Sequence, residues 1–363
     1  MPRAARAPRY RHGSLPGECP GVGFIESGPE LICDDILIPL QYAGPAAAST
    51  TPAELLLASA RLAGMLPAKP RSVSAAHPLR THSQAAIPSR QRRVHLPVII
   101  HADDFGETGD ITEGICLGIE AGVVTSTSVM VNMPGTADAL RRMPQLAQQA
   151  SFGIHLNLCE GRPLTRGATL MDANGQFLRK RTLAAHALAG KLSLPQLEAE
   201  VTAQVGMLRD AGVRVSHLDG HKHLHQLPIV CTAVARVLPR FGIERVRITR
   251  LGSWRSVHDL STLAREIAAR HAARVFARAG LRSPERTVDL RDLAAGKTLA
   301  PLTGAPPAAP VPIEICCHPG TAAADAGKPG SHRRENELEY LLSQEFRTLL
   351  AASGAALVSY WRV

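Results

Sequence analysis

The sequence contains few aromatic residues, which make up only 4% of its 363 residues. Proteins that hold single-stranded nucleic acid use aromatic side chains as stacking surfaces, and no nucleic-acid-binding motif is present either. The net charge of +10 therefore needs another explanation. About half of the excess positive charge falls within the first 95 residues, in clusters such as Arg90, Arg92 and Arg93. We expect no nucleic acid among the partners of the chain.

Long apolar runs are absent as well. No segment approaches the roughly 20 apolar residues that a transmembrane helix needs, and the best candidate for a secretion signal, Leu31–Leu40, contains Asp34 and Asp35. The seven cysteines are odd in number and include no C-x-x-C pair, although Cys316 and Cys317 are adjacent. This pattern argues against a disulfide framework or a zinc ribbon. We therefore expect a cytoplasmic protein with reduced thiols and no membrane span.

Residues 1–93 are rich in Ala, Pro, Arg and Ser and show little sustained period, apart from a helical stretch at about 52–65. Low-complexity segments of this kind bury too little apolar surface to fold alone. We expect residues 1–93 to be an Ala/Pro/Arg-rich extension that is disordered or weakly structured. A sharper hypothesis is that much of it is not translated, because GC-rich upstream DNA encodes such stretches when a start codon is assigned too early.

The pattern changes at Val94, where short apolar runs begin to alternate with segments of helical period. Such alternation is typical of βα units that build a parallel sheet. The predicted strands lie at 94–102, 124–132, 152–158, 215–218, 245–249, 287–290, 313–317 and 355–360, and the predicted helices at 111–121, 137–149, 194–211, 228–241, 260–279 and 335–352. We therefore expect residues 94–363 to form one α/β domain, a distorted (β/α) TIM-like barrel.

An open doubly wound sheet would give the same alternation, so the pattern alone leaves it as the alternative fold. The versions of that sheet that bind nucleotides carry a glycine-rich phosphate loop at a strand-to-helix turn. No G-x-G-x-x-G or G-K-[ST] sequence occurs at such a turn in this chain. This absence counts against a nucleotide-binding sheet.

Ionisable residues fall where the predicted strands end, which is where barrel enzymes build their active sites. Asp103 and Asp104 follow the first of these strands. A pair of aspartates after a strand is by itself more often a turn or a helix cap. On an extended backbone, however, adjacent side chains diverge. One carboxylate could then bind a cation while the other remains free as a base.

Histidines gather at three later strand ends. His155 stands alone among apolar neighbours, a setting in which a histidine is more often a core residue than a ligand. The segment 217–225 holds four histidines and Asp219 within nine residues, a density that packing does not explain, and His318 follows the strand predicted at 313–317. Carboxylates and imidazoles from separate strand ends would make a mixed oxygen and nitrogen site for zinc, magnesium or manganese.

Several of these segments together resemble the YdjC-like (ChbG/HpnK) carbohydrate deacetylase family. The segments that carry the resemblance, in the order and spacing of the family, are Ala102–Gly106, Gly122–Asn132, Gly153–Leu158, His217–His221 and Cys317–Pro319. The resemblance covers roughly residues 94–363 and none of the preceding extension. The chain departs from the family pattern at His101, where Asn is usual, and at Gly220, where Ser is frequent.

The resemblance implies a distorted (β/α) barrel and a divalent metal held by Asp104, His155 and His221, with Asp103 as the catalytic base. Mg²⁺ is our first choice of metal, and Zn²⁺ and Mn²⁺ are the alternatives. The implied reaction is the hydrolysis of a linear amide bond, which removes the acetyl group of an N-acetylated sugar or oligosaccharide. The partner of the enzyme would then be an N-acetylated carbohydrate, and the sequence also allows a homo-oligomer.

The remaining histidines are assigned supporting or competing roles. We assign His318 to the acid that protonates the leaving sugar amine, and His223 is its rival for that role. Asp219 and His217 are expected to fix the tautomers or orientation of the metal ligands from behind. His225 is expected to face the other side of its segment.

Other functions remain open beside the deacetylase. A metal-dependent phosphoesterase, or another amidohydrolase, could use the same cluster, and so could a non-catalytic sugar-binding relative. The presence of both Asp103 and Asp104 argues against the last, because a binding protein needs no free base beside a metal. Assays for acetate and for phosphate release separate the two enzymatic alternatives.

Deleting residues 1–90 should leave a folded and active domain, because that segment supplies no predicted barrel strand and no motif residue. The check is a thermal unfolding curve and an activity assay of the truncated chain beside those of the full chain. Loss of soluble, cooperatively unfolding protein on truncation would show that the extension packs on the barrel.

Overall fold

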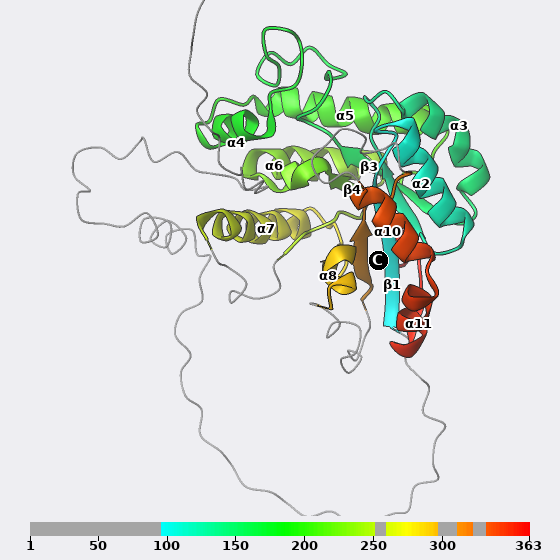
Figure 1. Ribbon diagram of the computed structural model, residues 1–363. Helices are drawn as coiled ribbons and strands as arrows, with labels where there is room; N and C mark the ends of the chain where they lie inside the picture. The colour runs from blue at the N-terminus through cyan, green and yellow to red at the C-terminus, as the bar shows by residue number, and fades with distance from the viewer. Residues whose placement is uncertain (1–95, 251–258, 297–310, 322–331) are drawn as a thin grey trace, which may run out of the picture. The chain divides into compact units, whose positions relative to one another are not determined.

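A central sheet of parallel strands organises the chain, in a computed structural model that describes residues 96–250, 259–296, 311–321 and 332–363 (Figure 1). Its strands are β1 (Leu96–Phe105), β2 (Ser126–Val129), β3 (Ser151–Leu156), β4 (Leu218–Gly220), β5 (Arg286–Asp289), β6 (Ile313–Cys317) and β7 (Ala355–Leu357). Their order in the sheet is β4-β3-β2-β1-β6-β5, and β7 pairs with β1. The expected extension at 1–93, with its helical stretch at 52–65, lies outside the described residues.

The strand β1 lies at the centre of the sheet and is shared by three neighbours. Its first residues pair with β7 and its last residues with β2 along one edge, while β6 runs along the other edge. Every residue of β1 except Pro97 is buried. A strand that is covered on both faces of a parallel sheet has a continuous apolar run, which Val98–Ile100 provides.

The pairing continues past β4 through single bridges. Leu218 of β4 bridges to Val246, and Arg245 bridges to Arg282, shortly before β5. Backbone hydrogen bonds support this path, from Arg247 N to Leu218 O at 2.9 Å and from Val246 N to Arg282 O at 2.8 Å. The predicted α/β fold, a distorted barrel of parallel strands, is therefore confirmed. The strand expected at 245–249 is not a regular strand, and its residues pair only through these isolated bridges.

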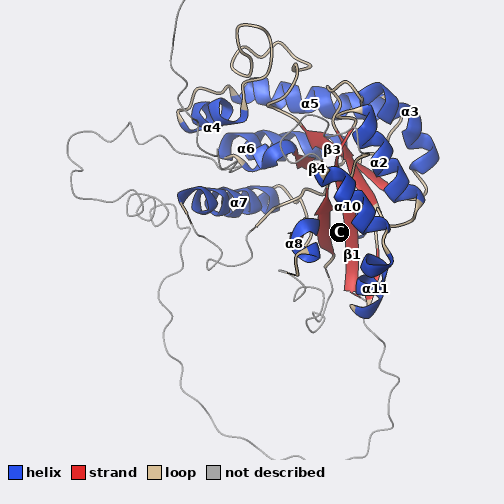
Figure 2. Ribbon diagram, viewed as in Figure 1, coloured by secondary structure: helices blue, strands red, loops and turns tan. Residues whose placement is uncertain are grey.

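Helices connect the strands and cover the sheet (Figure 2). In chain order they are α2 (Gly109–Glu120), α3 (Thr136–Leu146), α4 (Lys180–Leu188), α5 (Leu194–Asp210), α6 (Pro228–Val237), α7 (Leu260–Arg278), α8 (Leu290–Ala294), α10 (Arg333–Leu342) and α11 (Gln344–Ala352), with 3₁₀ turns η1 (His221–Gln226), η2 (Leu238–Phe241) and η5 (Tyr360–Arg362). α5 packs on α6 and α6 on α7, while α2 packs on both α3 and α10. Among the described residues, no helix has the length and apolar character needed to cross a membrane.

The helix expected at 335–352 is two helices, because Ser343 interrupts it. Ser343 has an extended backbone, with φ −70° and ψ 155°, and its side chain accepts a hydrogen bond from Phe346 N, which caps the start of α11. The sequence pattern also misses α4. This short Ala-rich helix buries only Leu183 and Ala184, so it lacks the broad apolar stripe that identifies a helix in a sequence.

The long segment between β3 and α5 is held in place by a buried side chain of α5. The Glu200 carboxylate accepts hydrogen bonds from the backbone of Leu164 and Thr165 and from the Thr165 hydroxyl. A buried carboxylate is tolerated when several donors satisfy it. These bonds fix the loop that carries Glu160, whose carboxylate lies 3.2 Å from Nε2 of His221 at the carboxyl ends of the strands.

The strands β3 and β4 come close together at Gly153. A Cβ at this position would lie 2.3–2.6 Å from ring atoms of His217. The His217 ring has little room to move, because it stacks on Tyr360 with 3.6 Å between ring centroids and both residues are fully buried. Glycine is therefore required here by close approach.

Gly153→Ala should destabilise the fold by about 1–3 kcal/mol, the usual cost of overpacking a core. Gly206→Ala is the matched control, because its Cβ would meet no atom within 4 Å and alanine in a helix is favoured over glycine by about 1 kcal/mol. Equilibrium unfolding in urea measures both variants. Equal stabilities would show that the His217 ring can move aside.

Candidate metal centre and active site

An irregular stretch of backbone at the end of β1 separates two adjacent carboxylates. The register with β2 shifts between Ala102 and Phe105, as in a β-bulge, and Asp104 has a left-handed backbone with φ 68°. Few residues other than glycine adopt this conformation, although aspartate does so more often than most. Asp103 and Asp104 are both buried, but their side chains have different partners. Asp104 contacts His221, whereas Asp103 contacts Arg247.

Asp104, His155 and His221 meet at the carboxyl ends of β1, β3 and β4. Oδ1 of Asp104 lies 3.1 Å from Nε2 of His155 and 3.0 Å from Nδ1 of His221. All three residues are buried, and their ligand atoms lie within 4.8 Å of one another. Two ligand atoms about 2.0–2.1 Å from a tetrahedral metal would stand roughly 3.3 Å apart. The spacing of this triad therefore fits one shared divalent cation.

Polar groups around the triad hold its side chains in this arrangement. Nδ1 of His155 lies 2.9 Å from Oδ1 of Asp219 and 3.0 Å from Oγ of Ser128, which leaves Nε2 to face Asp104. Carboxylate–histidine pairs of this kind set the tautomer and orientation of metal-binding imidazoles. On the other side, Nη2 of Arg334 donates to Oδ2 of Asp104 at 2.7 Å. Oδ1 of Asp104 is thus the oxygen that faces the imidazoles.

The triad lies in strongly negative surroundings. Burial lowers the pKa of His155, but Asp219 and Asp104 outweigh burial and raise this pKa well above its usual range. Burial also lowers the pKa of His221, yet the carboxylates of Asp104 and Glu160 raise it to about 9. Nearby carboxylates raise the pKa of an imidazole because they stabilise a positive charge. A divalent cation would supply that charge and leave the imidazoles neutral.

A fully buried arginine holds Asp103. Nη1 and Nη2 of Arg247 donate to the two oxygens of Asp103 at 2.8 and 2.7 Å. The same guanidinium lies 2.9 Å from Asp219 and 2.8 Å from Glu314, so that three carboxylates share one cation. Burial raises the pKa of Asp103, but Arg247 outweighs burial and holds this pKa well below its usual range. Asp103 therefore stays ionised.

His318 lies on the solvent side of Asp103, just after β6. Its Nε2 is 3.8 Å from Oδ2 of Asp103, and its side chain is 21% exposed. Its backbone N donates to the Glu337 carboxylate at 2.6 Å. Burial lowers the pKa of His318, but Glu337 and Asp103 raise it above its usual value. The His318 imidazole thus favours the protonated form beside the ionised Asp103.

The rival histidine, His223, has a different environment. Its Nδ1 lies 3.4 Å from Oγ1 of Thr249, and burial, together with His225 and Arg247, lowers its pKa to about 3. Its imidazole is therefore neutral near pH 7.

Lys222 and His223 both have left-handed backbones, with φ of 53° and 58°. Strained conformations of this kind cluster at functional sites.

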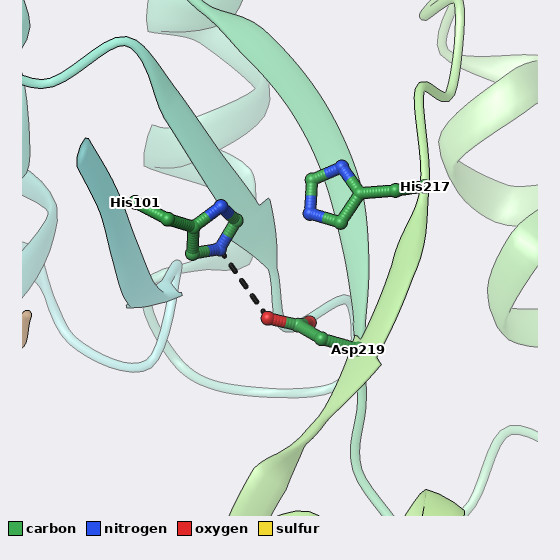
Figure 3. A group of neighbouring side chains, drawn as sticks. All are labelled: His101, His217 and Asp219. Carbon is green, nitrogen blue, oxygen red and sulfur yellow. Dashed lines mark ion pairs between the residues drawn. The ribbon is translucent and has the colours of Figure 1, made fainter. Parts of the chain in front are cut away.

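His101, His217 and Asp219 form a second group of neighbouring buried side chains (Figure 3). Nε2 of His101 lies 3.3 Å from Oδ2 of Asp219 and 3.4 Å from Oδ1 of Asp103, so it stands between these carboxylates. His217 stacks on Tyr360, and burial lowers its pKa well below the usual range. The His217 ring also makes an edge contact with the ring of His101.

His225, the last histidine of its segment, is fully buried and turns towards the bridge segment beyond β4. Its Nε2 lies 3.0 Å from the carbonyl oxygen of Arg247. Its ring also packs against Gly220, where a Cβ would lie 2.6 Å from Nδ1 of His225. Gly220 therefore provides the space that the His225 ring occupies.

Sequence reasoning misses the residues that balance the charge of the site. Arg247 and Glu314 lie within predicted strands, and a charged residue in an otherwise apolar run is a usable signal, because such residues are rarely buried unless paired. Arg334 gives no comparable signal, since it lies in the first turn of the polar helix α10 among other charged residues. Its contact with Asp104 spans 230 positions of the sequence.

The family model of YdjC-like proteins matches residues 97–352 of this sequence. The chain belongs to the YdjC-like family. The YdjC-like match spans all the proposed site residues, from Asp103 to His318, and the family resemblance predicted from the sequence is confirmed.

Curated relatives of this YdjC-like chain agree with that placement. It is 35% identical to proteins named "Carbohydrate deacetylase" from Mus musculus and Homo sapiens, over 73% of this chain and 93% and 90% of those proteins. A crystal structure of an Enterococcus faecalis V583 protein aligns with 73% of this chain and 98% of its own, with a TM-score of 0.58 and 21% identity. The structural likeness shows a shared fold.

Arg247→Met should destabilise this YdjC-like protein by about 3–5 kcal/mol, because it leaves buried carboxylates without their cation. Arg282→Met is the matched control, since it removes only an exposed ion pair with Glu244 and should cost at most about 1 kcal/mol. Equilibrium urea unfolding gives both values. A loss for Arg247→Met that is no larger than the control would mean that the carboxylates do not depend on the guanidinium.

Proposed function

We propose that this chain is a metal-dependent carbohydrate deacetylase, which hydrolyses the N-acetyl group of an N-acetylated sugar or oligosaccharide. The observation that carries the proposal is the meeting of Asp104, His155 and His221 around one point, with the ionised Asp103 on the preceding residue. Similar proteins named "Carbohydrate deacetylase" support the reaction and the substrate class. A cytoplasmic location and a homo-oligomer stay predictions.

The chemical problem is that water attacks an amide slowly and that the tetrahedral intermediate carries an oxyanion. A divalent cation held by Asp104, His155 and His221 would address both, by lowering the pKa of water and polarising the acetyl carbonyl. Two imidazoles and one carboxylate suit Zn²⁺ or Mn²⁺ on ligand grounds, whereas the sequence puts Mg²⁺ first. Metal analysis of the purified protein decides among the three.

Asp103 is assigned to the base that accepts a proton from the attacking water. Arg247 keeps this carboxylate ionised and fixes its direction through two hydrogen bonds. The same guanidinium makes Asp103 a weak base, because a lowered pKa reduces the driving force for proton transfer. The proton therefore needs an onward path. His318, with Nε2 3.8 Å from Oδ2 of Asp103, offers one after it has given its own proton to the leaving amine.

His318 suits the acid better than His223 does. A general acid must be protonated before it acts, and the pKa of His318 is raised whereas that of His223 is lowered to about 3. His318 also combines partial exposure with proximity to Asp103. The amide nitrogen of an N-acetylated sugar that enters from solvent would therefore meet the His318 imidazole beside the base.

Asp103→Asn and Asp104→Asn should fail in different ways. Asp103→Asn should keep the metal and lose about 10²–10⁴-fold in rate, the usual cost of a missing general base. Asp104→Asn should weaken metal binding, so its activity should partly recover at high metal concentration. The measurement is a metal titration of both variants, read as metal bound and as acetate released from N-acetylglucosamine-containing oligosaccharides.

The wild-type chain is the control for folding and for metal content, and phosphate release from phosphorylated sugars is followed in parallel. Phosphate release without acetate release would replace the deacetylase by a phosphoesterase. Loss of metal from Asp103→Asn, or near-normal turnover of that variant, would mean that the roles of the two aspartates are reversed or that the mechanism is wrong.

A further inference from the structure

The strand β6 places two adjacent cysteines on opposite faces of the sheet. Cys317 belongs to the main apolar core together with Ile315. Cys316 is buried but lies outside that apolar cluster, on the face that Glu314 shares with it. Because successive side chains of a strand alternate between faces, Cys316 and not Cys317 is directed into the site with His318.

The Cys316 thiol lies beside the two groups assigned to proton transfer. Its Sγ, a carboxylate oxygen of Asp103 and a ring nitrogen of His318 lie within 4.8 Å of one another. Nε2 of His318 and Oδ2 of Asp103 are 3.8 Å apart, against the roughly 3.3 Å that separates two ligands of a tetrahedral zinc ion. A bound cation would have to draw the partly exposed His318 side chain slightly closer to Asp103.

The charge around Asp103 leaves room for a cation. Arg247 contributes one positive charge, while the carboxylates of Asp103, Asp219 and Glu314 that contact it contribute three negative charges when ionised. Arg247 alone leaves these carboxylates with an excess of negative charge, part of which His155 offsets where it pairs with Asp219. In a poorly solvated interior such a surplus favours the binding of a divalent cation.

We propose that Asp103, Cys316 and His318 form a second metal site, separate from the Asp104 triad, that takes a thiophilic divalent cation such as Zn²⁺. A thiolate, an imidazole and a carboxylate are zinc ligands, whereas Mg²⁺ is bound by oxygen ligands. The thiol proton is released to solvent as the sulfur binds the cation. Occupation of this site inhibits the enzyme, a consequence that rests on the proposed function, because the cation ties up both the base and the acid.

The direct test is a Co²⁺ titration of the full chain after removal of bound metal with a chelator. Binding at the second site should produce a thiolate-to-cobalt charge-transfer band in the near ultraviolet, with two Co²⁺ bound per chain. Cys316→Ser should abolish the band and leave one Co²⁺ bound. Cys317→Ser is the matched control, because the neighbouring thiol packs in the apolar core, and it should keep the band.

Inhibition gives a second readout on the same variants. The Zn²⁺ concentration that halves acetate release should rise by at least about tenfold in Cys316→Ser, since losing even a group that supports a metal ligand typically costs 10–100-fold in metal affinity. Cys317→Ser should be inhibited like the wild type. Cys316→Ala repeats the measurement without a hydroxyl, in case serine disturbs the buried strand.

The outcomes separate the second site from the deacetylase proposal. No charge-transfer band in the wild type, or a band that persists in both Cys316 variants, overturns the second site whatever the activity. A band that disappears in Cys159→Ser instead would place the thiolate beside Glu160 and His221, and it overturns the proposal equally. A Cys316-dependent band in a chain that releases no acetate supports the second site and contradicts only the deacetylase.

Discussion

One buried guanidinium ties together the strands that carry the site. Arg247 contacts Asp103 of β1, Asp219 of β4 and Glu314 of β6, carboxylates that would repel one another in a poorly solvated interior. Asp219 in turn orients His155. The direction of the proposed base and the direction of a proposed metal ligand thus depend on the same cation, although the two groups belong to different strands.

Much of this arrangement follows from the sequence. The apolar run of β1 and the alternation of strands and helices predict a parallel barrel with ionisable side chains at one edge. The family resemblance selects Asp104, His155 and His221 among them, and the structure brings these three together. The bulge at the end of β1 does not follow from the pattern, because the left-handed backbone of Asp104 accompanies a register shift against β2, and strand register is a tertiary feature. The sequence pattern also does not predict the contact between Arg334 and Asp104, since no local pattern encodes a partner 230 residues away.

The chain departs from the family pattern at His101 and Gly220, and the structure shows what each residue contacts. His101 replaces the usual Asn and reaches Asp103 and Asp219 with one ring nitrogen. Gly220 stands where Ser is frequent, and it leaves space for the ring of His225. The first departure changes what lies between two buried carboxylates. The second admits a histidine whose ring supports the backbone of Arg247.

The pairing of β1 with the end of the chain has a consequence for synthesis. β1 begins at Leu96, yet its partners β6 and β7 begin at Ile313 and Ala355. At about 5–20 residues per second, a ribosome needs on the order of 10–50 s to make the chain between β1 and β7. During this time the edge of β1 that pairs with β6, and the first residues that pair with β7, have no partner, and unpaired strand edges are prone to aggregation. Heterologous expression should therefore benefit from chaperones that hold nascent chains.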